Sequence, residues 1–478
     1  MSSDKHVVIV GGGFAGLNAA KELCNRSGVR VTVIDRRNHH LFQPLLYQVA
    51  MAAISPADIA VPIRSIVSKN NNTDVILAPV LGIDRTKNQV ICDFKSIDYD
   101  YLILACGASH SYFGRDDWED NAPGLKSIEE GTEIRRRVFL SYELAEREND
   151  IALQKELLTF IVVGGGPTGV ELAGALGEIS RYTLQSDFRH INPTRTRIIL
   201  IEAGPRILPA FDSKLSEYAA RELERLGVTI WTNTMVTNVA SDSVTAGGET
   251  IRARTILWAA GVMANSISKT IGTELDRQGR VVVEPDLSIQ GSPNIFVVGD
   301  LASFSHTDDQ KPLPGLAPVA IQQGKHAARN ILADIMKKER KPFHYFDKGI
   351  MATVGRANAI VQIGQTGRFH STGFFAWLTW LIVHIAYLIS FRNRVMVLFQ
   401  WGWSYFNFRR GARLIRSKIW KTRQLELTLD QKRAERQLVE NSAQKLNMTQ
   451  KTSKKTAKKE VKKMVKTNQT RKSKTAVG

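Results

Sequence analysis

The sequence predicts an α/β fold built from two Rossmann-like dinucleotide-binding domains, followed by a C-terminal helical segment that associates with membranes. Three observations lead to this prediction. A glycine-rich turn follows an apolar run near the N-terminus, the same pattern recurs near residue 161, and a long uncharged apolar run lies near residue 380. A chain of 478 residues can form two or three domains, each with its own core.

The second glycine-rich stretch, residues 161–171, reads IVVGGGPTGVE. Its β-branched run predicts a strand and the residues after the turn predict a helix, the unit that holds a dinucleotide phosphate. Gly164 permits the turn, Gly166 lets backbone approach a pyrophosphate, and Gly169 lets the helix pack on the strand. The residues expected to bind NADH here are Gly164, Gly165, Gly166, Pro167, Thr168 and Gly169.

The N-terminal stretch, residues 6–16, repeats this pattern as HVVIVGGGFAG. Each copy precedes an apolar strand that ends in an acid, Asp35 or Glu202, placed to accept a hydrogen bond from a ribose. Because Glu202 would repel a 2′-phosphate, the nucleotide is expected to be NADH. Two such folds predict two dinucleotides, FAD first and NADH second. The FAD residues expected here are Gly11, Gly12, Gly13, Phe14, Ala15, Gly16 and Asp35.

Two short apolar strands, residues 101–108 and 255–261, are expected to carry the chain out of the first domain and back. The NADH domain is therefore predicted to be an insertion within the FAD domain. The expected boundaries are 1–112 and 286–370 for the FAD domain, 113–285 for the NADH domain, 371–415 for the membrane-associating segment and 416–478 for a basic, disordered tail.

Further cofactor contacts are expected where strands and helices end near the two nucleotides. The apolar strand before Gly299 and Asp300 places this acid to hydrogen-bond the ribityl chain of FAD. A helix start with small residues, from Ala317, lets backbone approach the flavin ring, and its dipole favours an anionic reduced ring. The remaining expected contacts are Arg36, Gln43, Gly107, Val319 and Ala320 for FAD, and Ala260 and Gly261 for NADH.

Cysteine and histidine usage argues against several other chemistries. Cys24, Cys92 and Cys106 lie far apart without a CxxC pair, which disfavours a disulfide framework, a zinc site and a redox-active cysteine pair. The adjacent His39 and His40 cannot both face one site, so no metal site is expected. The first strand is expected to begin by about Val7, so no signal or transit peptide is expected.

Several longer motifs together resemble the bacterial type II NADH dehydrogenases, the single-subunit NADH:quinone oxidoreductases. The resemblance runs from about residue 6 to 415 and rests on GGGFAG at 11, LFQPLLYQVA at 41, GGGPTGVELAGAL at 164, FVVGD at 296, LAPVAIQQGK at 316 and DKGIMATVGRANAI at 347. It implies non-covalent FAD and NADH oxidation with quinone reduction, without proton pumping, feeding the respiratory chain. It also implies attachment to the cytoplasmic face of the bacterial inner membrane. Cys106 departs from the threonine frequent in this family.

Two catalytic residues are expected, Glu171 and Gln322. The resemblance places Glu171 at the junction of nicotinamide and flavin, where it would orient NADH and tune the reduced flavin. The alternative is a solvated carboxylate that the helix dipole stabilises. Quinone is expected at the opposite edge of the ring, near Ala317, Gln322 and Pro44.

The C-terminal region explains how such an enzyme would reach a lipid substrate. Residues 374–391 carry no charge, and tryptophans and arginines follow, a pattern typical of the headgroup boundary. A single membrane-spanning helix would place the basic tail on the outer side of the membrane, whereas basic residues are favoured on the cytoplasmic side. Two interfacial segments or a shallow hairpin are therefore expected. The alternative is that the same apolar faces form a homodimer interface.

The net charge of +19 comes almost entirely from residues after 408, where lysines recur at helical spacing. Residues 371–466 are therefore expected to bind anionic membrane lipid. Nucleic acid is disfavoured because no groove-reading motif accompanies the charge. A tail that only confers solubility is the third alternative.

Two other kinds of flavoprotein remain as alternatives. A sulfide:quinone oxidoreductase would need cysteines that pass sulfur beside the flavin, and the three cysteines here are poorly placed for that. A flavoprotein of the apoptosis-inducing type would bind NADH and nucleic acid. The residues expected to bind quinone would then have no function.

Overall fold

The computed structural model describes residues 4–305, 311–364, 369–407 and 410–415. These residues fall within one compact unit, residues 1–415. The basic tail expected at 416–478 lies outside the described residues.

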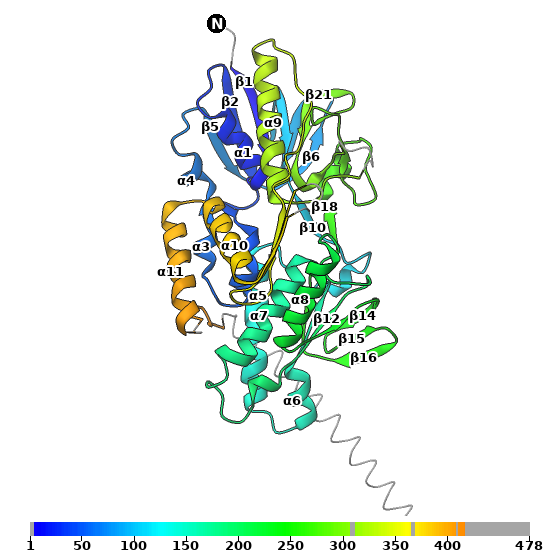
Figure 1. Cartoon of the computed structure of the whole chain (residues 1–478). Helices are drawn as coiled ribbons and strands as arrows, with labels where there is room; N and C mark the ends of the chain where they lie inside the picture. The colour runs from blue at the N-terminus through cyan, green and yellow to red at the C-terminus, as the bar shows by residue number, and fades with distance from the viewer. Residues whose placement is uncertain (1–3, 306–310, 365–368, 408–409, 416–478) are drawn as a thin grey trace, which may run out of the picture. The chain divides into compact units, whose positions relative to one another are not determined.

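The first sheet is parallel except for one edge strand, and it combines the N-terminal part of the chain with residues near 290 (Figure 1). Its order is β20 (Ser288–Ile289), β21 (Ser292–Val297), β9 (Tyr101–Leu104), β1 (Lys5–Val10), β2 (Val29–Asp35) and β5 (Thr73–Leu77). Helices α1 (Phe14–Leu23) and α9 (Ala317–Ile335) cover one face. Gly324 is required there, because a Cβ on it would lie 2.1 Å from the Ala15 carbonyl oxygen.

The second sheet is parallel and four-stranded, with the order β13 (Val228–Trp231), β12 (Arg197–Ile201), β11 (Thr159–Val163) and β17 (Thr255–Trp258). Its helices are α5 (Ile128–Glu146), α6 (Ile151–Leu157), α7 (Pro167–Glu178) and α8 (Ser213–Arg225). A small antiparallel sheet packs on its core and consists of β14 (Val236–Ala240), β15 (Ser243–Ala246) and β16 (Glu249–Arg252). The two expected dinucleotide folds are therefore both present.

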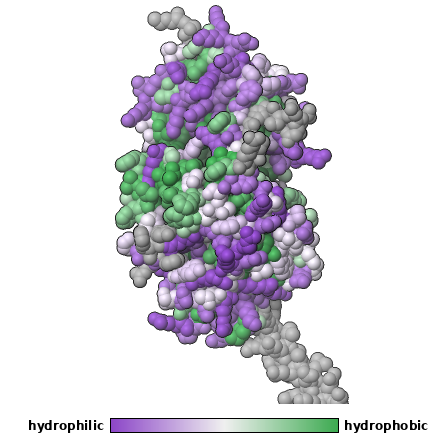
Figure 2. Space-filling model, viewed as in Figure 1, coloured by the Kyte–Doolittle hydropathy of each residue, from purple (hydrophilic) through white to green (hydrophobic). Residues whose placement is uncertain are grey.

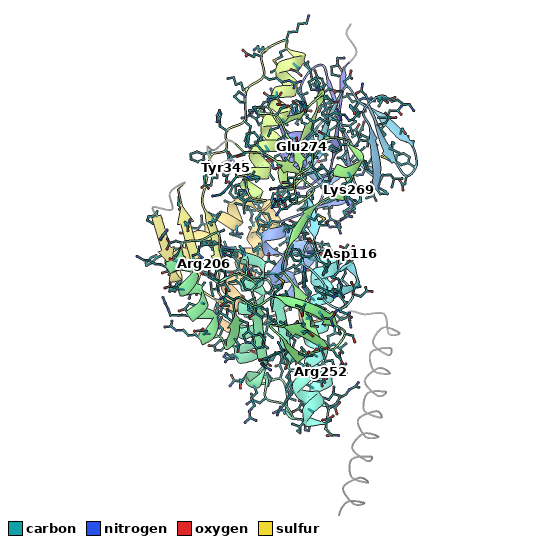
Figure 3. The ribbon with its side chains drawn as sticks, turned by 90° about the vertical axis from the view of Figure 1, so that its right-hand side faces the viewer. Asp116, Arg206, Arg252, Lys269, Glu274 and Tyr345 are labelled. Carbon is teal, nitrogen blue, oxygen red and sulfur yellow. The ribbon has the colours of Figure 1, made fainter. Side chains whose placement is uncertain are left out.

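Two antiparallel strands, β10 (Ala108–His110) and β18 (Val262–Ala264), connect the two sheets. The chain leaves the first sheet through β10, and the second sheet is the expected insertion. Ala264, Ile267 and Ile271 already pack in the core of the first sheet, so the chain rejoins it earlier than the expected residue 286. Figure 3 shows Lys269 and Glu274 beside the first sheet, whereas Arg252 lies in the inserted part.

The other face of the first sheet packs against a three-stranded antiparallel sheet of β6 (Val80–Asp84), β7 (Gln89–Cys92) and β8 (Ser96–Asp98). The short elements that follow the first acid are β3 (His39–Leu41), α2 (Leu46–Ala50), α3 (Pro56–Ile59), β4 (Ala60–Pro62) and α4 (Ile63–Val67). Two further short strands, β19 (Val281–Val282) and β22 (Ala302–Ser303), pair in parallel.

The C-terminal part begins with an antiparallel sheet, β23 (Ile350–Thr353), β24 (Ala359–Ile363) and β25 (Phe369–Thr372). Two helices follow, α10 (Gly373–Tyr387) and α11 (Phe391–Asn407), which are orange in Figure 1. Polar side chains attach α11 to α3: Asn393 donates to the Ala57 carbonyl oxygen at 3.2 Å, and Gln400 donates to the Asp58 carboxylate at 3.1 Å.

Candidate functional site

The two glycine-rich loops have the same geometry. Gly11 and Gly164 have φ angles of +105° and +106°, which only glycine adopts without strain. A Cβ on Gly16 would lie 1.8 Å from the Gly11 carbonyl oxygen, and a Cβ on Gly169 would lie 1.9 Å from that of Gly164. The first and third glycines are therefore required by the turn and by the approach of the helix.

The middle glycines, Gly13 and Gly166, differ from the others because a Cβ on either would meet no atom within 4 Å. Each precedes a helix, α1 or α7, and neither helix start has a side-chain cap. The open space faces uncapped N–H groups at a positive helix end, a combination that fits a pyrophosphate. The residues present therefore fit a dinucleotide at both loops.

The two strand-end acids occupy equivalent positions, because Val10 pairs with Ile34 and Val163 pairs with Ile201. Each carboxylate also holds its own glycine loop.

The Asp35 carboxylate accepts a hydrogen bond from Gly12 N at 2.6 Å, and the Glu202 carboxylate accepts one from Gly165 N at 2.6 Å. The second oxygen of Glu202 accepts from Gly204 N at 2.7 Å. Sequence reasoning assigned these acids to a ribose alone and missed their role in the loops.

Several expected FAD contacts converge beside α1. A Cβ on Gly299 would lie 3.4 Å from the Ala320 side chain and 3.5 Å from that of Ala15. The backbone N–H of Gly299 donates to the amide oxygen of Gln323 at 2.7 Å, and Gln323 is only 1% exposed. Gln323 therefore fixes the turn that begins at Gly299, a role that sequence reasoning did not assign.

The remaining residues expected to contact the cofactors lie mostly in loops near the starts of helices α1 and α7. Asp300 follows Gly299 in a short 3₁₀ turn, and its carboxylate lies 3.1 Å from the position of a Cβ on Gly315. Gln43 donates to the Lys126 carbonyl oxygen at 3.2 Å. Gly261 has a φ of +74°, and a Cβ on it would lie 2.7 Å from the Phe113 ring. Arg36, Gly107, Ala260, Pro167 and Thr168 lie in the loops or helix starts that follow these strands, and Val319 is buried in α9.

His40 lies against the first loop. Its Nδ1 is 3.0 Å from the Gly12 carbonyl oxygen, and its ring meets Phe14 edge-on. Burial lowers the pKa of His40 to about 4, so the ring is neutral at physiological pH. No group of three or more histidine, cysteine or acidic residues suited to a metal occurs in the described part of the chain.

A cavity of ≈ 110 Å³ brings together segments that are far apart in the sequence. Helix α7 contributes Glu171, α2 contributes Tyr47, and β23 contributes Thr353. The C-terminal helices contribute three tryptophans to its wall. The other lining residues are Gln48, Ala53, Ala175, Glu178, Thr183, Gly355, Arg356, Trp377, Trp380, Trp401, Ser404 and Arg410.

Glu171 is the carboxylate placed to act in this cavity. Burial raises its pKa to about 8, against the opposing effect of the neighbouring Thr353. At neutral pH the group therefore holds a proton that it can release and recover near pH 8. Glu171 is partly buried in the cavity wall.

Gln322 and Pro44 do not line this cavity. The amide of Gln322 donates to the Phe346 carbonyl oxygen at 2.9 Å and accepts from Phe346 N at 3.0 Å. Pro44 lies in a short 3₁₀ turn one residue before the buried Leu45. Tyr47, Gln48 and Thr353 lie in the motifs that carried the family resemblance, yet no local pattern indicated that their side chains meet.

Helices α10 and α11 expose many large apolar side chains, and Figure 2 shows hydrophobic residues gathered over this region. They include Phe374, Phe375, Leu378, Ile382, Phe391, Val395, Met396, Leu398, Phe399 and Trp403. Among the helices that the structure describes, none is both long and apolar enough to cross a membrane.

The fold and the paired loops define a class of protein, the nucleotide-dependent flavoprotein reductases. Residues 5–324 match the family described as pyridine nucleotide-disulphide oxidoreductase, and residues 348–410 match the NDH2 C-terminal domain. Among solved structures, the chain is similar to NDH2 from Plasmodium falciparum in complex with NADH. That match has a TM-score of 0.78 at 19% identity, over 87% of this chain and 100% of the other.

Two curated relatives from Mycobacterium tuberculosis share more of the sequence. The type II NADH:quinone oxidoreductase Ndh is 44% identical over 85% of this chain and 89% of its own length. The related NdhA is 43% identical over 90% of this chain and 93% of its own length. The chain belongs to the type II NADH:quinone oxidoreductase family, as the sequence motifs predicted.

Proposed function

We propose that this protein is an FAD-dependent enzyme that oxidises NADH and reduces a membrane quinone without pumping protons, so that it feeds a respiratory chain. The observation that carries the proposal is the presence of two similarly built, open nucleotide-binding loops on one body. The Glu171 cavity, walled by C-terminal tryptophans, supports it further. The chemistry that bound FAD supplies is acceptance of a hydride from NADH and return of two electrons to a quinone.

The residues of this chain supply position and charge. Gly13 and Gly166 leave room for the two pyrophosphates, and the starts of α1 and α7 attract their negative charge. Glu202 accepts a hydrogen bond from the NADH ribose and repels a 2′-phosphate, which favours NADH over NADPH. The turn at Gly299 and Asp300, with the start of α9, holds the ribityl chain and ring of FAD.

Glu171 holds the proton that quinone reduction consumes, in a cavity partly walled by tryptophans. On this proposal Gln322, with Ala317 and Pro44, lies on the quinone side.

We further infer that α10 and α11 rest on the cytoplasmic face of a bacterial inner membrane through their exposed apolar side chains. Interfacial helices of this composition bury apolar side chains at the boundary of headgroups and acyl chains. Binding of anionic lipid through residues 371–466 and homodimer formation through the same face are separate proposals. Flotation with vesicles of differing anionic content tests the first, and the mass of the detergent-solubilised protein tests the second.

Stopped-flow flavin absorbance tests the central proposal. Purified holoenzyme is mixed with NADH or NADPH, and the reduced protein is then mixed with a soluble ubiquinone or menaquinone analogue. Fast bleaching by NADH and fast return with quinone are expected. Absence of bleaching by either nucleotide would contradict the second nucleotide site, and bleaching without return on addition of quinone would contradict quinone reduction.

The second candidate function is sulfide:quinone oxidoreduction. It is tested in the same experiment by mixing the oxidised holoenzyme with sulfide. The fold is also similar to that of the sulfide:quinone oxidoreductase from Aquifex aeolicus, with a TM-score of 0.66 at 20% identity. Burial raises the pKa of the Cys106 thiol to about 12 and raises that of Cys92. Thiols held in this form are weak nucleophiles, so sulfide is expected to leave the flavin oxidised.

A further inference from the structure

Phe113 is an exposed aromatic residue at the point where the chain enters the inserted domain. Its side chain is 70% exposed, and its backbone φ is +54°. A bulky residue at positive φ is strained, and such strain persists only where the surrounding structure holds the residue in place. The proposed function has so far given this residue no role.

Hydrogen bonds hold the strained segment in place. The indole N–H of Trp258 donates to the Ser111 carbonyl oxygen at 2.9 Å, and the Ser111 N–H donates to the Gly261 carbonyl oxygen at 3.3 Å. The Phe113 N–H donates to the Ser111 hydroxyl at 3.3 Å. The backbone of Phe113 therefore has a fixed position, although most of its ring is exposed to solvent.

The ring lies against the segment that leaves the end of β17. A Cβ on Gly261 would lie 2.7 Å from the ring Cζ of Phe113, so one edge of the ring rests on the Gly261 backbone. A Cβ on Gly164 would lie 2.7 Å from the backbone at residues 259–260. One short stretch of backbone thus contacts both the second nucleotide loop and the Phe113 ring.

The strand order of the second sheet determines which half of a dinucleotide passes this stretch. Ligands of such sheets lie at the carboxyl ends of the strands, where the strand order reverses. Here the order reverses between β11 and β17, because β12 and β13 lie on the other side of β11. Glu202, after β12, is on the adenosine side. The end of β17, with Phe113, is therefore on the nicotinamide side.

The same end of β17 adjoins the connection to the first nucleotide loop. Strands β10 and β18 pair between the two sheets (Figure 1). A Cβ on Gly11 would lie 2.4 Å from the carbonyl oxygen of Ala105, shortly before β10, and Phe113 follows β10. Val262 and Met263 of β18 are 50% and 39% exposed. Exposed apolar side chains therefore line the connection between the two loops.

We propose that Phe113 contacts the nicotinamide ring of NADH with its exposed ring and so binds that end of the nucleotide. Flat aromatic rings stack favourably on one another. The strained backbone keeps the ring at the end of β17 before NADH arrives, which lowers the ordering cost of binding. The proposal rests on the proposed function in taking the second loop as the NADH site. It adds the residue that recognises the nicotinamide.

The test compares NADH with ADP-ribose, which lacks the nicotinamide. Stopped-flow reduction of the oxidised holoenzyme at increasing NADH concentration, without quinone, gives the Kd for NADH. ADP-ribose is then added as a competitor, which gives its inhibition constant. Phe113→Leu should raise the Kd for NADH about fivefold and leave the inhibition constant of ADP-ribose unchanged.

Two further variants separate the ring from the backbone strain. Phe113→Tyr keeps the ring and should retain the wild-type Kd, although tyrosine is as strained as leucine at this φ. Phe113→Asn removes the ring but tolerates positive φ, and should weaken NADH binding as Phe113→Leu does. Phe94→Leu is the matched control, because Phe94 lies between β7 and β8 and is 56% exposed. It should change neither constant.

An unchanged Kd for NADH in Phe113→Leu would overturn the proposal. Equal weakening of NADH and ADP-ribose would also overturn it, because the ring would then act on the part that the two ligands share. Flavin absorbance per chain and the melting temperature confirm that each variant is folded. Failure of the proposed function is distinguishable, because NADH would then not bleach the flavin of the wild type.

Discussion

The two glycine-rich loops are built alike, yet the chain surrounds them differently. Distant segments enclose the first loop. Helix α9 packs against Ala15, the turn at Gly299 adjoins the same residue, and His40 and Phe42 place their rings on Phe14. The second loop is contacted by residues of its own domain: Glu202, Ile207 and the backbone at Ala259.

This difference bears on how long each ligand stays bound. Both loops are open to solvent where the helix starts, because Gly13 of the first loop and Pro167 of the second are exposed. On the proposed function, the remote segments around the first loop would slow the release of FAD, whereas the second loop would exchange NADH. The surroundings decide this difference, because the glycine spacing is shared.

The largest expected effects come from substituting the third glycine of either loop, Gly16 or Gly169. Each substitution should weaken binding of a different ligand. Alanine at Gly16 or Gly169 would place a Cβ within 2 Å of a carbonyl oxygen, which forces the helix away from its loop. Gly16→Ala should weaken FAD retention about tenfold or more, and Gly169→Ala should retain FAD but abolish bleaching by NADH. Flavin absorbance per chain and NADH stopped flow measure the two effects.

Gly166→Ala is the control for this prediction. A Cβ there meets no protein atom, so the melting temperature should stay near that of the wild type while the KM for NADH rises. Equal flavin loss in Gly16→Ala and Gly169→Ala would show that the two loops do not serve separate ligands.

Removing the charge of the second acid should change nucleotide preference. Glu202→Gln keeps an oxygen for one loop N–H but loses the charge that repels a 2′-phosphate. We expect kcat/KM for NADH to fall by roughly tenfold and the discrimination against NADPH to shrink. Asp35→Asn should instead lower flavin retention and leave nucleotide preference unchanged; a change in preference there would contradict the division between the loops.

Two adjacent glutamines on α9 offer a third comparison. Gln323→Leu leaves the Gly299 N–H without its acceptor, which should cost about 1–3 kcal/mol of unfolding free energy and weaken FAD binding. Gln322→Ala should raise the KM for quinone while NADH still reduces the flavin at a nearly normal rate. Slowed flavin reduction with an unchanged quinone KM would place Gln322 elsewhere.

A different kind of effect is expected in the pH dependence of stability. Because the folded pKa of Glu171 is about 8, above its ordinary value near 4.5, the folded state binds more protons than the unfolded state between these limits. Glu171 therefore makes stability fall as pH rises from about 5 to 8. Glu171→Gln should reduce this slope, as measured by melting temperature against pH. An unchanged slope would contradict the raised pKa.

The sequence by itself determined both nucleotide folds and, from several separate motifs, the family. Each nucleotide fold depends on residues that are close in the chain: a strand, three glycines and a helix within about a dozen positions. The sequence also singled out Glu171, because it lies one turn into a helix whose start was already identified.

Only the tertiary structure decided what surrounds these motifs. Tyr47, Glu171, Thr353 and Trp401 come from four separate elements, and no spacing rule indicates that they line one cavity. The sequence pattern predicted a site role for Gln322 and none for Gln323. Only the packing of α9 on α1 shows which of the two amides is buried. Backbone conformation is determined by neighbours in the chain, whereas the orientation of a hydrogen bond and the pKa of a buried carboxyl depend on groups that the fold brings together.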